Sequence, residues 1–143
     1  MESSLFEANL DNLDAMRHYV EQTARKMGAE QPAVDATVQA TDEWTTNIIL
    51  HGYRRGPGKI RIEVRRQRDD LVVTVRDGAP WFNPAVIPTP DLTLPLEERP
   101  LGGLGYYIIR KLMDRVHYRA IPEGGNELTL ARKAFRGKEG ETS

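Results

Sequence analysis

Residues 59–76 read KIRIEVRRQRDDLVVTVR and indicate the class of fold. In the first half, isoleucine or valine alternates with charged residues, which is the period-two pattern of a strand with one buried and one solvated face. The second half is more continuously apolar, which is typical of a central strand covered on both sides. We therefore predict an antiparallel hairpin formed by strands over 59–68 and 71–76.

Two helices are predicted before this hairpin. Apolar residues recur at three- and four-residue steps over 13–27, and Gly28 is the predicted C-cap of that helix. Pro32 suits the first turn of a second helix, which we predict over 33–51. A short strand over 5–8 is expected ahead of the first helix.

Beyond the hairpin, six prolines fall within residues 77–101, too many for a regular element. A loop of this length in a compact domain is usually functional, so we interpret it as a lid over a site. A third helix is predicted over 106–113, and a last hairpin over 116–120 and 127–132. This order of elements predicts an α+β fold, a two-layer sandwich with helices packed on one face of a mixed or antiparallel sheet.

Composition limits the classes of function. The 143 residues fit one domain, which we expect over 1–135 with a flexible tail over 136–143. A net charge of -1 and a pI near 6.3 give no overall field for nucleic acid, so we interpret the arginine-rich run over 54–68 as a solvated hairpin face. The lack of cysteine and the wide separation of the three histidines argue against thiolate and zinc sites. No apolar stretch approaches the roughly 18 residues of a membrane span, so we expect a cytoplasmic protein that binds neither membrane nor nucleic acid directly.

Glu43, Asn47 and His51 follow at four-residue spacing in the second predicted helix, which places their side chains on one stripe. A carboxylate can orient or deprotonate an attacking hydroxyl, and an amide oxygen is a hard ligand suited to a Mg²⁺ ion that also binds phosphates. An exposed polar helix face is the alternative for all three, and a favourable interaction with the helix dipole is the alternative for His51. Asn47 favours a binding site, because asparagine is a poor helix former and this one stands beside apolar residues.

Two further segments are candidates for nucleotide contacts. Asp77 follows a predicted buried strand, where its carboxylate could accept a hydrogen bond from the exocyclic amine of a base; an Asp-Gly turn is the alternative. Gly102, Gly103, Leu104 and Gly105 precede the third predicted helix, whose unpaired N–H groups favour an anion such as phosphate. A glycine cluster alone is weak evidence, and this one matches neither the lysine-containing phosphate loop nor a dinucleotide fingerprint.

Taken together, three segments resemble the anti-sigma factor serine/threonine kinases, a branch of the wider ATPase superfamily of gyrase, histidine kinases and heat-shock chaperones (GHKL). The segments are residues 43–53, residues 77–84, and residues 103–105 ahead of a helix. The likeness extends over about residues 5–133 and implies a Bergerat-type ATP-binding fold. One departure is Ala79, which stands where the family usually has glycine and whose methyl group could crowd a nucleotide.

The resemblance implies a role for each matched residue. Glu43 would act as general base toward a serine or threonine hydroxyl of a protein substrate, and Asn47 would bind Mg²⁺. Asp77 would accept a hydrogen bond from the adenine amino group. The remaining candidate nucleotide contacts are His51, Ala79, Phe82, Gly102, Gly103, Leu104 and Gly105.

ATP and Mg²⁺ are the implied cofactors. The implied partners are a small STAS-type antagonist protein of an anti-sigma factor, which the kinase would phosphorylate, and a sigma factor, which it would sequester to regulate transcription. The resemblance also implies a homodimer. A non-catalytic ATP-sensing switch that binds a protein is the alternative, and the retention of Glu43 favours the kinase.

Overall fold

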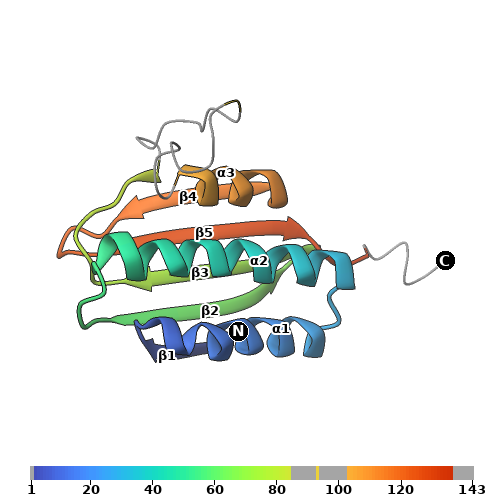
Figure 1. Ribbon diagram of the computed structural model, residues 1–143. Coiled ribbons are helices and arrows are strands. Elements are labelled where there is room, and N and C mark those ends of the chain that lie inside the picture. Colours follow the sequence, from blue (N-terminus) through green and yellow to red (C-terminus); the bar gives the residue numbers. More distant parts are fainter. Residues whose placement is uncertain (1, 85–92, 94–102, 137–143) are drawn as a thin grey trace.

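The computed structural model describes residues 2–84, 93 and 103–136. Most of the predicted lid over 77–101 and of the predicted tail over 136–143 therefore lies outside the described residues. In the described part, three helices cover one face of a five-stranded sheet (Figure 1). This is the predicted α+β sandwich, with a sheet that is antiparallel throughout.

The sheet has the strand order β1-β2-β3-β5-β4. The strands are β1 (Glu2–Glu7), β2 (Lys59–Gln67), β3 (Asp70–Asp77), β4 (Arg115–Ala120) and β5 (Asn126–Lys133). As predicted, β3 is the central strand. β1 begins earlier than the predicted strand over 5–8, because its polar first half pairs with β2 although it carries no strand pattern of its own.

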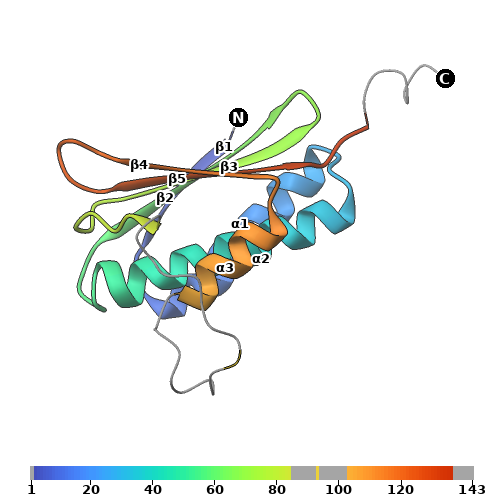
Figure 2. The same cartoon turned by 90° about the horizontal axis from the view of Figure 1, so that it is seen from above.

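The helix layer consists of α1 (Leu13–Lys26), α2 (Gln31–Asn47) and α3 (Gly103–Leu112), with a 3-10 turn, η1 (Leu10–Asn12), ahead of α1. α2 lies between the other two helices and over β3 and β5 (Figure 1). All three helices lie on the same side of the sheet (Figure 2). Among the described residues, none of the helices has the length and apolar character needed to cross a membrane.

The second predicted helix changes pitch near its end. α-Helical geometry stops at Asn47, and a π-helical turn, η2 (Ile48–Gly52), continues the chain. The amide of Tyr53 donates to the carbonyl of Ile48 at 2.7 Å, five residues back. Because a π turn holds more residues than an α turn, side chains along η2 do not follow the α-helical spacing assumed for this segment.

The third helix begins earlier than predicted. α3 starts at Gly103, so Gly103, Leu104 and Gly105 form its first turn instead of preceding it. Glycine disfavours helix interiors by about 1 kcal/mol, which led to the later predicted start, and packing against α2 overrides that preference.

The core fills the space between the helix layer and the sheet. Trp44 is its largest fully buried side chain. The other fully buried side chains include Met16, Val20, Val34, Ile48, Ile60, Ile62, Leu71, Ile109, Leu128 and Leu130. At the end of α3, the Arg132 guanidinium donates to the carbonyl of Leu112 at 2.7 Å, so a cation from β5 meets the negative end of the helix dipole.

The turn between β4 and β5 packs against the end of β3. Gly124 and Gly125 both have a positive φ, +114° and +111°. A Cβ atom on Gly125 would lie 2.1 Å from the carbonyl oxygen of Asp77, whereas a Cβ atom on Gly124 would meet nothing within 4 Å. The backbone of Gly125 is therefore the one that fits against β3.

This difference predicts unequal costs for two otherwise identical substitutions. Gly124→Ala should lower the free energy of unfolding by about 1 kcal/mol, because only the backbone conformation is disfavoured. Gly125→Ala should lower it by about 3 kcal/mol or more, because the methyl group also displaces the end of β3. Urea unfolding of both variants measures the difference, and equal costs would contradict the close packing of this turn against Asp77.

Candidate functional site

α2 places Glu43 and Asn47 against the start of α3. The two residues are one helical turn apart on α2, and Gly105 lies directly opposite them. A Cβ atom on Gly105 would lie 3.0 Å from Glu43 Oε2 and 3.2 Å from Asn47 Nδ2. A side chain at this position would require the ends of the Glu43 and Asn47 side chains to shift by a few tenths of an ångström. The structure thus brings the first and third predicted motifs together.

The Asn47 side chain is 5% exposed, and its Nδ2 finds no hydrogen-bond partner among the described residues. A buried donor without a partner costs about 1–3 kcal/mol. The fold makes no use of this amide nitrogen, which is what a side chain kept for a polar ligand requires.

Glu43 is half-buried beside it. Burial raises the pKa of the Glu43 carboxyl, and the negative charge of Asp42 raises it further. Asp42 itself accepts a hydrogen bond from Arg17 at 2.7 Å. A carboxylate with a raised pKa is a stronger base than an ordinary one, which suits proton abstraction from a hydroxyl.

Asp77, the last residue of β3, carries the second part of the site. Its side chain is buried, and Oδ1 accepts hydrogen bonds from the Ala79 amide and from Asn126 Nδ2, both at 2.9 Å. Oδ2 is buried and has no partner among the described residues. Burial raises the pKa of Asp77 to about 6, although both hydrogen bonds act to lower it. Asp77 therefore keeps one free, buried acceptor, as recognition of an exocyclic amine requires.

Asn126 is a site residue that the sequence did not reveal. It is fully buried at the start of β5, directly opposite Asp77 in the ladder. Besides Asp77, its Nδ2 donates to the carbonyl of Pro80 at 3.1 Å, and its Oδ1 accepts from the Phe82 amide at 2.7 Å and from the Tyr118 hydroxyl. In the sequence, an asparagine after two glycines indicates only a turn. Strand pairing makes it the residue that fixes Asp77 and the segment after it.

Ala79, which stands where the family usually has glycine, packs against a glycine of η2. Ala79 is 1% exposed, and a Cβ atom on Gly52 would lie 3.1 Å from the Ala79 Cβ. The methyl group is therefore buried against the backbone of Gly52. Whether it crowds a nucleotide, as expected from the sequence, stays a prediction.

Phe82 and His51 pack with α2. The Phe82 ring stacks on Trp44, with ring centroids 6.0 Å apart, and His51 meets its edge at 6.5 Å. These contacts hold the segment after β3 against α2, next to Asn47. Gly102 and the side chain of Leu104, both predicted nucleotide contacts, lie outside the described residues.

The site thus combines a half-buried base, two buried polar atoms without partners and a glycine at a close helix contact. Comparison with known proteins assigns the family: residues 6–132 match the histidine kinase-like ATPase domain. The chain belongs to the histidine kinase-like ATPase family. As a member of that family it is an ATP-binding domain, and the resemblance drawn from its motifs is confirmed.

The curated relatives of this ATPase domain are regulators. It is 32% identical over 97 residues to the serine-protein kinase RsbW of Bacillus mycoides, a match that covers 65% of this chain and 61% of RsbW. It is 30% identical over 97 residues to the anti-sigma F factor of Oceanobacillus iheyensis, with 67% of this chain and 66% of that protein covered. The chain thus spans 61 to 66% of the length of these relatives.

A solved structure shows the same fold. The RsbU and RsbW domains of Rv1364c from Mycobacterium tuberculosis match with a TM-score of 0.62 at 15% identity, over 95% of this chain and 33% of that one. At this identity the match confirms the fold of the ATPase domain and nothing finer.

The raised pKa of Asp77 predicts a pH-dependent effect of Asp77→Asn on stability. The pKa of Asp77 in the folded state lies above the ordinary value of 3.8. As pH rises, the unfolded chain therefore loses this proton first, and the free energy of unfolding falls until about pH 6. At about 1.4 kcal/mol per pKa unit, the variant should gain about 1–3 kcal/mol of unfolding free energy at pH 7.5. The gain should shrink as pH falls from 6 towards 4, and urea unfolding at several pH values measures it.

The same variant tests the role of Asp77 in binding. Asparagine replaces the free acceptor by an N–H donor, so the affinity for ATP should fall about tenfold or more in calorimetry. Asp70→Asn is the matched control, because Asp70 lies at the other end of β3 and forms an ion pair with the exposed Arg115. Unchanged ATP affinity in Asp77→Asn would show that this carboxylate does not bind the base.

Proposed function

We propose that this domain is an ATP-dependent protein kinase of the anti-sigma type. Its substrate is a serine or threonine of a small STAS-type antagonist protein, and a sigma factor is its second partner. The observation that carries the proposal is the pair Glu43 and Asn47, held against Gly105 at the junction of α2 and α3. The similarity to RsbW and to anti-sigma F factor supports the choice of substrate class.

The residues present fit a Mg–ATP complex. Asn47, whose buried Nδ2 has no partner among the described residues, would hold Mg²⁺ through its amide oxygen, and Asp77 Oδ2 offers a buried acceptor for the adenine amine. The N–H groups in the first turn of α3, including that of Gly105, suit the phosphates. Among the described residues, no three or more acidic, histidine or cysteine side chains gather into a metal site, so the metal would rest on Asn47 and the phosphates.

Glu43 is assigned as the general base. When bound, Mg–ATP supplies the γ-phosphoryl group, which forms a new P–O bond with the substrate hydroxyl as ADP leaves. Glu43 accepts the proton that the hydroxyl loses, and its raised pKa makes it a stronger base than an ordinary glutamate. Asp77, fixed by Asn126, holds the adenine end of ATP, and Asn47 positions its phosphate end.

Glu43→Gln separates binding from transfer. It should leave the affinity for ATP within about threefold of the original, while label transfer from γ-³²P-ATP to the STAS-type antagonist of the same genome falls about a hundredfold or more. Asp42→Asn is the matched control: it removes the neighbouring carboxylate, which bonds Arg17, and should keep most of the activity. Transfer that survives Glu43→Gln would refute the general-base role.

An ATP-sensing switch without catalysis would give a different result. In that case the unsubstituted domain binds ATP tightly yet transfers no label to the antagonist protein. Glu43→Gln then changes neither ATP binding nor label transfer.

Asn47→Ala tests the metal position. Affinity for ATP should fall about tenfold or more and lose its dependence on Mg²⁺. The unfolding free energy should stay unchanged or rise, because the variant removes a buried amide N–H group that has no partner among the described residues. A loss of stability with unchanged ATP binding would instead make Asn47 a structural residue.

A further inference from the structure

The face of the sheet opposite the helices is covered by no described element (Figure 2). Strand alternation and register arrange its side chains in rows across β2, β3, β5 and β4. One row is Arg65, Val72, Ala131 and Arg115; the next is Glu63, Thr74, Thr129 and His117; a third is Arg61, Arg76, Glu127 and Arg119. We call this surface the open sheet face.

The carboxylates of the open sheet face lie beneath its arginines. Glu63 accepts a hydrogen bond from Arg65 at 3.1 Å and lies 3.5 Å from Arg76. Glu127 accepts from Arg76 at 2.7 Å and from Arg119 at 3.2 Å. Both glutamate side chains are 14% exposed, against 51% for Arg119. The outer layer of this face therefore consists of guanidinium groups.

Positive charge is in excess on this face. The cations Arg61, Arg65, Arg76, Arg115, Arg119 and Lys133 outnumber the carboxylates Glu63, Asp70 and Glu127. The whole chain carries a net charge of -1, so the local field has the opposite sign to the overall charge.

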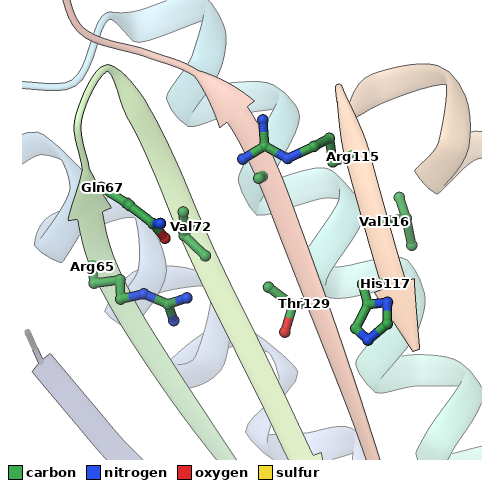
Figure 3. A pocket seen from close by; sticks show the side chains of 8 residues that line it. Arg65, Gln67, Val72, Arg115, Val116, His117 and Thr129 are labelled. Atoms are coloured by element: carbon green, nitrogen blue, oxygen red, sulfur yellow. The ribbon is translucent and has the colours of Figure 1, made fainter. Parts of the chain in front are cut away.

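A hollow of about 390 Å³ opens in the middle of the open sheet face (Figure 3). Val72, Thr129 and Ala131 lie at its centre, with Arg65 and Gln67 on one side and Arg115 and His117 on the other. The side chains of Arg65 and Arg115 both extend inward over the sheet (Figure 3). Arg65 donates to Glu63 and Thr74, and Arg115 donates to Asp70. Val72 and Ala131 are only 1% and 3% exposed, so cations flank the hollow on two sides and little apolar surface is open within it.

We propose that the open sheet face binds an extended acidic segment of a protein partner. The segment lies along the hollow between β2 and β4. Its carboxylates bond the N–H groups of Arg65 and Arg115 that Glu63, Thr74 and Asp70 do not use. Arginine suits this task, because its planar fork bonds a carboxylate through two N–H groups.

The charge pattern disfavours the other occupants. A second copy of the chain would bring the same positive face against this one, so a homodimer would use a different surface. Single-stranded nucleic acid binds largely by stacking bases on aromatic rings, and in the three rows named above the single aromatic ring is the imidazole of His117.

This surface is separated from the nucleotide site by the sheet. Glu43, Asn47 and Gly105 lie in the helix layer, on the other side (Figure 2). A partner on the open sheet face therefore leaves the nucleotide site accessible, and the inference does not depend on kinase activity.

The test measures peptide binding by fluorescence anisotropy. The probe is a labelled twelve-residue peptide of Glu and Asp around a central Leu-Phe pair. One control is the same peptide with Gln and Asn in place of every acidic residue. The other control is a poly-dT oligonucleotide of equal charge. The acidic peptide should bind the full chain, about tenfold more tightly than its neutral version, and should weaken between 50 and 200 mM salt.

Two variants on the face locate the binding. Arg115→Glu should weaken the acidic peptide about tenfold or more, and Arg65→Gln should weaken it less, because it removes one cation without reversing charge. Arg25→Glu, an exposed residue in the last turn of α1 with the same change in charge, should bind within about twofold of the original. Unchanged thermal unfolding and ATP binding in the three variants show that each is folded.

The proposal is overturned by equal binding of the neutral peptide, by an equal loss in Arg25→Glu, or by tighter binding of the oligonucleotide through the same arginines. If the domain fails to bind ATP while Arg115→Glu abolishes peptide binding, the proposed kinase function is refuted and the proposed binding role of the open sheet face is still supported.

Discussion

The contact between α2 and the first turn of α3 is the constraint on which the site depends. Gly105 has no side chain, so α3 can approach α2 closely enough to lie against Glu43 and Asn47. α2 meanwhile buries Trp44 against the core on its other side. One helix thus anchors the fold through its apolar face and presents a carboxylate and an amide along its edge.

The site is assembled at a cost in stability. Asn47 and Asp77 each keep a buried polar atom without a partner among the described residues, and Asp77 is held in a setting that disfavours its charge. Such groups are destabilising in isolation, and binding sites commonly retain them because a ligand satisfies them. Asn126 offsets part of the cost, because its amide bonds Asp77 and the backbone that follows β3.

The sheet divides the domain into two surfaces with different chemistry. The helix side carries buried polar groups in small number, arranged for one nucleotide. The open side carries an ordered layer of arginines above two largely covered glutamates, arranged along rows of the sheet. The near-zero net charge of the chain conceals this division, because a sum over all residues removes the spatial pattern.

The sequence by itself determined the type and order of the elements, the α+β class and the pairing of Glu43 with Asn47, because these follow from periods of two and of 3.6 residues within short segments. It also identified Asp77 through its place after a buried strand. Only the tertiary structure decided the early start of β1, the π turn over Ile48–Gly52, the start of α3 at Gly103 and the role of Asn126. Each of these depends on contacts between segments far apart in the chain, and packing energy there overrides the local preferences that a sequence pattern records.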